Sequence, residues 1–93
     1  MSGETREMTL LNKYGLHVRP AGLFAKIASR FNAEVMVDKD GTVVSGKSIM
    51  ALMTLEAVCG TILKVTADGP EAKDVLDALQ GLVSRRFDIP DEQ

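Results

Sequence analysis

The sequence predicts a small α+β domain in which helices pack on one face of an antiparallel sheet, with the element order β-α-β-β-α-β-α. Three observations predict this class. Four short segments alternate between apolar and polar residues, as half-buried strands do. Two longer segments each carry one apolar stripe at helical spacing. The 93 residues suffice for a single domain, spanning 1–93, and are too few for two.

The first strand is predicted from Thr5 to Leu11, because Met8 and Leu10 fall on one face of that segment. The polar and glycine residues of the next segment, Asn12 to Gly15, predict a turn.

The first helix is predicted from about Val18 to Phe31. Pro20 fits a helix only in its first turn, where the missing amide hydrogen costs nothing. This places His17, the only histidine, just before that turn. The apolar stripe of the helix comprises Leu23, Phe24, Ile27, Ala28 and Phe31.

A hairpin is predicted next. The segment Glu34 to Asp38 places Val35 and Val37 on one face, Lys39 to Gly41 is a turn signal, and Thr42 to Ser45 is the return strand.

A short helix is predicted from Ser48 to Leu55, with Ser48 as its N-cap. Ser48 is either only a cap or a modification site, where a phosphate would meet the positive helix end. Gly46-Lys47-Ser48 also resembles the end of a phosphate-binding P-loop, but the upstream glycine is absent at the required spacing, which excludes that motif.

Six of the seven residues from Ile49 to Leu55 are apolar, so they cannot all share one helix face. Either the helix is deeply packed, or some of Ile49, Met50 and Met53 are exposed as an adaptable surface for partners. The residues alone leave the two readings about equal.

The last strand is predicted from Ile62 to Ala67, and the turn Asp68 to Pro70 leads into a final helix ending near Phe87. The stripe of that helix comprises Val75, Leu76, Leu79, Leu82, Val83 and Phe87. We expect residues 1–3 and 88–93 to be flexible.

The composition disfavours several functions. A net charge of −2 and 4% aromatic residues leave neither a basic footprint nor a stacking platform for nucleic acid. The longest apolar run has five residues, against the roughly 20 of a membrane-spanning helix. Met1 to Glu7 lacks a signal-peptide core, and a single cysteine indicates a reducing, cytoplasmic setting.

Cys59 is predicted to be a buried, inert thiol, because its neighbours are apolar. One histidine and one cysteine argue against a zinc site, and no dinucleotide-binding or metalloprotease motif occurs. We therefore expect neither a metal nor a cofactor.

The segment Gly15 to Ala21 is the strongest candidate for chemistry. His17 precedes a helix whose free N–H groups and dipole favour an anion. Arg19 adds a forked donor suited to phosphate, and a neutral imidazole is a nucleophile that can form a phospho-intermediate. The alternative is a histidine that merely caps the helix, and the residues alone favour it slightly.

With these motifs in place, the chain resembles the family of the histidine-containing phosphocarrier protein HPr, from about Glu7 to Val83. Gly15 to Ala21 is similar to its active-site segment, and Lys47 to Leu55 to its regulatory serine segment. The resemblance implies an open-faced β-sandwich, with a four-stranded antiparallel sheet covered on one side by three helices.

The resemblance also implies the function and the site. His17 would accept a phosphoryl group, derived from phosphoenolpyruvate, from Enzyme I and pass it to Enzyme IIA domains, with Arg19 assisting. Ser48 would be phosphorylated by HPr kinase/phosphorylase and could contact a transcriptional regulator. The docking residues would be Leu23, Ile49, Met50 and Met53. The chain would act as a monomeric relay in sugar transport rather than as a turnover enzyme.

Two positions depart from the family pattern. Val18 stands where alanine or threonine is common, and Glu56 where glycine is frequent. Asn12-Lys13 and Gly69-Pro70 also resemble the nitrogen-related branch, NPr. The alternatives are therefore an NPr-type carrier, a regulatory module controlled through Ser48 without relay, and an unrelated ligand- or RNA-binding domain.

Overall fold

The computed structural model describes residues 3–89, and within them four strands form one antiparallel sheet of order β1-β4-β2-β3. The strands span Glu4–Thr9 (β1), Glu34–Lys39 (β2), Thr42–Ser45 (β3) and Ile62–Asp68 (β4). β4 pairs with β1 on one side and with β2 on the other, whereas β3 pairs only with β2. The predicted hairpin is confirmed, and its two turn residues, Asp40 and Gly41, both have positive φ, as a tight two-residue hairpin turn requires.

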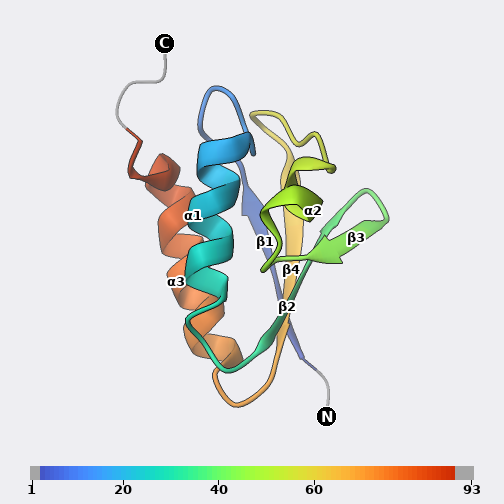
Figure 1. Cartoon of the computed structure of the whole chain (residues 1–93), viewed down its shortest axis with the longest axis vertical. Helices are drawn as coiled ribbons and strands as arrows, with labels where there is room; N and C mark the ends of the chain where they lie inside the picture. The colour runs from blue at the N-terminus through green and yellow to red at the C-terminus, as the bar shows by residue number, and fades with distance from the viewer. Residues whose placement is uncertain (1–2, 90–93) are drawn as a thin grey trace.

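Three helices accompany the sheet, as predicted: Val18–Ala28 (α1), Ile49–Met53 (α2) and Ala72–Ser84 (α3). Figure 1 shows α1 and α3 side by side across the sheet, with the short α2 beside α1 and β3. The other sheet face carries exposed side chains such as Lys64, and Thr5 and Thr66 exchange a hydroxyl hydrogen bond of 2.8 Å. The sandwich is therefore open on that side.

The core lies between the helices and the covered sheet face. The predicted strand faces are confirmed, because Met8, Leu10, Val35 and Val37 are all buried. So are Phe24 and Ala28 of α1 and the whole predicted stripe of α3. Leu23, Ile27 and Phe31 are only half-buried against this core.

The predicted end of the first helix is wrong by three residues, since α1 stops at Ala28 rather than at Phe31. Its last turn tightens, with Arg30 N–H donating to the Ile27 carbonyl at 3.0 Å. The chain has only a few residues in which to reverse before β2 begins at Glu34. Phe31 packs against the core from this connection instead of from the helix.

The final helix also ends early, at Ser84, and a short 3₁₀ turn, Arg86–Asp88 (η1), follows it. All three residues of η1 have φ between 55° and 60°, the left-handed region that L-residues rarely adopt. Phe87 is nevertheless fully buried, as a member of the predicted stripe should be. The left-handed turn of η1 thus places the Phe87 ring in the core, although α3 has already ended.

Two other expectations concern Cys59 and the chain ends. The prediction that Cys59 is buried is wrong, because it is exposed in the turn between α2 and β4. Of the segments expected to be flexible, 1–2 and 90–93 lie outside the described residues. Asp88, at the start of the second segment, forms an ion pair with Arg85, whose Nε–H donates to Oδ1 of Asp88 at 3.0 Å.

Candidate functional site

The loop that leads into α1 is built around Gly15. This residue has φ +63°, and a Cβ placed on it would lie 2.2 Å from the Ala57 carbonyl oxygen, so no larger residue fits unchanged. The next residue, Leu16, donates its N–H to that same carbonyl at 2.9 Å. The buried Asn12 donates its side-chain N–H to the Gly15 carbonyl at 2.6 Å. The loop before His17 is therefore fastened to the segment that follows α2.

His17 is the N-cap residue of α1, as predicted, and its carbonyl accepts the first helical hydrogen bond from Ala21 N–H at 2.9 Å. Its side chain makes no capping hydrogen bond. The imidazole is half-buried and meets the Tyr14 ring edge-on, with centroids 6.0 Å apart. The first turn of α1 contains no acidic residue, so nothing there offsets the positive end of the helix.

Arg19 lies exposed in the first turn of α1 and lines a groove of about 290 Å³ that runs along this helix. Three further cations line the same groove, namely Lys26, Arg30 and Arg85. The half-buried Leu23 forms part of its wall. Among the described residues, the only carboxylate that lines the groove is Asp88, which pairs with Arg85, so the groove is positive although the whole chain is slightly acidic.

Ser48 caps α2 as predicted, because its hydroxyl accepts a hydrogen bond from Ala51 N–H at 3.1 Å. The side chain is only half-buried, and the first turn of α2 has no acidic residue. A Cβ on Gly46 would lie 2.6 Å from Cγ1 of Val35. Gly46 is thus needed for close packing on the core, consistent with excluding a P-loop.

The short helix α2 exposes apolar residues, which decides between the two readings of its sequence. Ile49, Met50 and Met53 are 42%, 80% and 41% exposed, whereas Leu52 and Leu55 are buried. A Cβ on Gly22 would lie 3.9 Å from Cδ1 of Ile49, so the start of α2 runs alongside the first turns of α1. Figure 1 shows α2 beside α1, whereas Leu23, the fourth predicted docking residue, lines the groove that α1 shares with the end of α3.

Two exposed apolar side chains in the loops beside this surface could not be predicted from the sequence: Tyr14 and Val58. Their exposure has no local signal, because it depends on how the loops before α1 and after α2 meet. For Tyr14, its place three residues before His17 in a turn would have been a usable clue.

Glu56, one of the departures from the family pattern, has φ +51°. A glycine would adopt this conformation without strain, which accounts for its frequency at this position. The Lys39 ammonium donates to the Leu55 carbonyl at 2.9 Å and helps to hold the chain there. Val18, the other departure, is exposed beside His17.

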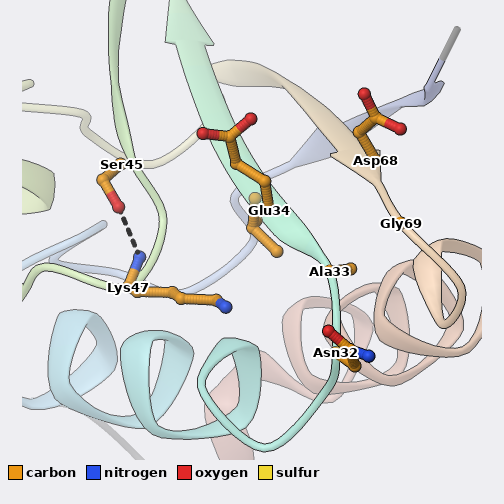
Figure 2. A pocket seen from close by; sticks show the side chains of 8 residues that line it. Asn32, Ala33, Glu34, Ser45, Lys47, Asp68 and Gly69 are labelled. Carbon is orange, nitrogen blue, oxygen red and sulfur yellow. Dashed lines mark hydrogen bonds between the residues drawn. The ribbon is translucent and has the colours of Figure 1, made fainter. Parts of the chain in front are cut away.

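A separate polar hollow of about 450 Å³ lies at the other end of α1, near Asn32 (Figure 2). Glu34, Lys47 and Asp68 line it, and Lys47 N–H donates to the Ser45 hydroxyl at 3.2 Å. None of the residues predicted to carry chemistry lines this hollow.

Within residues 3–89, no group of three or more histidine, cysteine or carboxylate side chains is arranged to hold a metal ion. No helix in that range has the length and apolarity needed to cross a membrane.

Comparison with known proteins agrees with this geometry. The family model described as PTS HPr component phosphorylation site matches residues 4–85. The phosphocarrier protein HPr of Pseudomonas putida is 43% identical over 84 residues, covering 89% of this chain and 93% of the relative.

Solved structures of phosphocarrier proteins also resemble this chain in fold. The crystal structure of HPr-C-His from Thermoanaerobacter tengcongensis has a TM-score of 0.89 at 36% identity, covering 97% of this chain and 99% of that one. The Bacillus subtilis catabolite repression protein Crh, crystallised as a domain-swapped dimer, has a TM-score of 0.72 at 40% identity, covering 80% and 85%. The chain therefore belongs to the HPr family, the phosphocarrier proteins of the phosphotransferase system.

Proposed function

We propose that His17 accepts a phosphoryl group from Enzyme I, which takes it from phosphoenolpyruvate, and passes it to Enzyme IIA domains. One observation carries this proposal. The only histidine of the chain stands at the N-cap of α1, yet its side chain makes no capping hydrogen bond. A histidine that merely capped the helix would use its side chain for that purpose.

The proposed transfer needs one nucleophile and groups that stabilise charge on the phosphoryl oxygens. A neutral imidazole nitrogen of His17 attacks phosphorus, and the new N–P bond forms as the bond to the donor breaks. The reverse exchange passes the group to the acceptor. The free N–H groups of the first turn of α1 and the Arg19 guanidinium stabilise the charge on the phosphoryl oxygens. Positioning and electrostatic stabilisation account for most of the catalysis in such a transfer.

The exposed surface of α2, formed by Ile49, Met50 and Met53, docks Enzyme I and the IIA domains together with Leu23 of α1. Flexible methionine side chains suit a carrier that must fit several partners in turn. The cations along α1 favour partners with an acidic rim.

Ser48 is the regulatory phosphorylation site, modified by HPr kinase/phosphorylase. A phosphate there adds a charge of roughly −1.5 to −2 at the N-terminus of α2, directly beside Ile49 and Met50. It weakens docking to Enzyme I and creates a contact for a transcriptional regulator.

The relay is tested by incubating the chain with phosphoenolpyruvate and Enzyme I and measuring acid-labile phosphate. We expect label on the wild type and on Ser48→Ala, which keeps the imidazole, and none on His17→Ala. Failure of the wild type to take up label from a matched Enzyme I would exclude the relay.

The control function of Ser48 has its own test. Ser48→Asp should accept phosphate from Enzyme I more slowly than wild type, whereas Ser84→Asp adds the same charge at the exposed end of α3 and should not. Equal rates for wild type and Ser48→Asp would contradict the switch.

Membership of the HPr family removes the alternative of an unrelated RNA- or ligand-binding domain. Two alternatives within the family are separated by the same assay. An NPr-type carrier would take phosphate preferentially from the Enzyme I of the nitrogen-related branch. A regulatory module without relay would bind partners but acquire no phosphate on His17.

We also propose that the chain works in the cytoplasm as a monomer. The docking surface and His17 are both accessible on a single copy of the described chain. Since Crh was crystallised as a swapped dimer, sedimentation at micromolar concentration is the appropriate check. A stable dimer would contradict the monomer.

A further inference from the structure

We infer that Tyr14 is a positioning residue for the phosphoryl transfer, because its ring holds the His17 imidazole in one orientation. This inference rests on the proposed relay through His17. It assigns a role to a residue that the sequence motifs did not single out.

The backbone of His17 is fixed, but the hydrogen bonds of the cap do not fix its side chain. Its φ of −81° and ψ of −171° are set by the helix start, and the ring takes no part in capping. A histidine side chain can in general adopt several staggered rotamers. Transfer requires one ring nitrogen to face the incoming phosphorus, so the other rotamers are unproductive.

The contact with Tyr14 limits this freedom. The two ring centroids lie 6.0 Å apart with an interplanar angle of 89°, the edge-to-face arrangement that aromatic pairs prefer. Any large rotation of the imidazole about its first side-chain bond would break this arrangement. The productive rotamer is therefore populated more than it would be next to an aliphatic residue.

Tyr14 is itself held in place on its other flank. The Lys13 ammonium lies 5.2 Å from the centre of the Tyr14 ring, within reach of a cation–π attraction. The backbone on the C-terminal side is fastened by Gly15, whose N–H donates to the Asn12 carbonyl at 3.2 Å. The tyrosine thus offers a constrained surface to the imidazole.

A merely structural role for Tyr14 is disfavoured by its exposure. Half of its surface is open to solvent, and it does not belong to the hydrophobic core. Replacing it should leave the fold and its stability nearly unchanged. Any effect on transfer then reports on the site itself.

The test compares wild type with Tyr14→Leu, Tyr14→Phe and Leu11→Ala. Leu11→Ala trims an exposed apolar residue of the same loop and serves as the control. Nuclear magnetic resonance of the unphosphorylated proteins gives the His17 rotamer from three-bond couplings and the ring contact from the chemical shifts of the imidazole protons. The rate of phosphoryl uptake from Enzyme I is then measured as separate kcat and KM values.

For Tyr14→Leu we expect averaged couplings, a shift of the imidazole protons and a kcat reduced about two- to tenfold, with KM unchanged. Tyr14→Phe keeps the ring and should match wild type, as should Leu11→Ala. Unchanged couplings or an unchanged kcat in Tyr14→Leu would overturn the inference. So would a loss in Tyr14→Phe as large as in Tyr14→Leu, or an effect confined to KM, which would indicate docking.

The two proposals fail in different ways. If wild type took up no phosphate at all, the relay would be wrong, whatever the rotamer measurements gave. If wild type is phosphorylated normally and Tyr14→Leu behaves like wild type, the relay stands and the positioning role does not.

Discussion

Gly15 decides where His17 lies. Its positive φ and its contact with the Ala57 carbonyl let the loop before α1 press against the segment after α2. Leu16 then bonds to the same carbonyl, and His17 follows at the start of the helix. The proposed phosphoryl acceptor is therefore positioned by a neighbour that has no side chain of its own.

Replacing Gly15 by alanine should destabilise the fold and slow phosphoryl uptake. Gly41→Ala is the matched control, since Gly41 also has positive φ but would have no atom within 4 Å of a new Cβ. Both variants bear the backbone strain of about 1–2 kcal/mol. Gly15→Ala should lose about 1–3 kcal/mol more, because its Cβ must displace Ala57. Equal losses in urea unfolding would contradict this account.

At the scale of elements, an ion pair joins α3 to β1, a strand at the edge of the sheet. Asp77 of α3 pairs with Arg6 of β1 at 2.7 Å and with Lys73 of its own helix at 3.0 Å. Hydrogen bonds from Lys73 and from Arg6 lower the pKa of the Asp77 carboxyl below its ordinary value of 3.8. This carboxylate is half-exposed, so the contribution is small and sensitive to salt.

The pH dependence of Asp77→Asn follows from that direction. A carboxyl whose pKa is lowered on folding stabilises the folded state above the unfolded pKa and loses this effect as the pH falls through the folded value. Asp77→Asn should therefore melt slightly below wild type at pH 7, and the two should converge as the pH falls below the lowered pKa of Asp77. Melting curves in 1 M salt are the control, where the difference should shrink. A difference that grows on acidification would refute the assignment.

Over the whole molecule, the loop that leads into α1 and the short helix α2 lie close together, and α1 joins them to the groove lined by Arg19. The loop before α1 and the loop after α2 meet (Figure 1). The polar hollow near Asn32 lies at the opposite end of α1 (Figure 2). A partner that docked on α2 as proposed would therefore lie close to the loop that carries His17.

Met50→Ala tests this surface. Met50 is the most exposed of the three apolar α2 residues, so its loss should change stability by less than about 0.5 kcal/mol. The Kd for Enzyme I should rise by about five- to thirtyfold, the range for a buried interface anchor. Val43→Ala, which trims an exposed residue on β3, should leave the Kd unchanged. Equal effects of the two variants by calorimetry would contradict a specific docking surface.

Local patterns in the sequence determined much of this protein. Alternating residues identified the four strands and their buried faces, Pro20 located the start of α1 and hence the N-cap position of His17, and Ser48 capped α2 as expected. These features depend on neighbours within a few residues, so a single sequence contains them. The resemblance of two separate segments to the HPr family supplied the function that local physics had left open.

Only the tertiary structure decided the rest. The exposure of Met50 and Cys59, the left-handed turn at Phe87 and the contact of Gly15 with Ala57 all depend on segments distant in the chain. Tyr14 and His17 are only three residues apart in the sequence. Their ring contact nevertheless depends on the conformation of the loop before α1, which is held by its hydrogen bond to Ala57. Apolar content predicts that a residue prefers burial, but packing between distant segments determines which residues the core has room for.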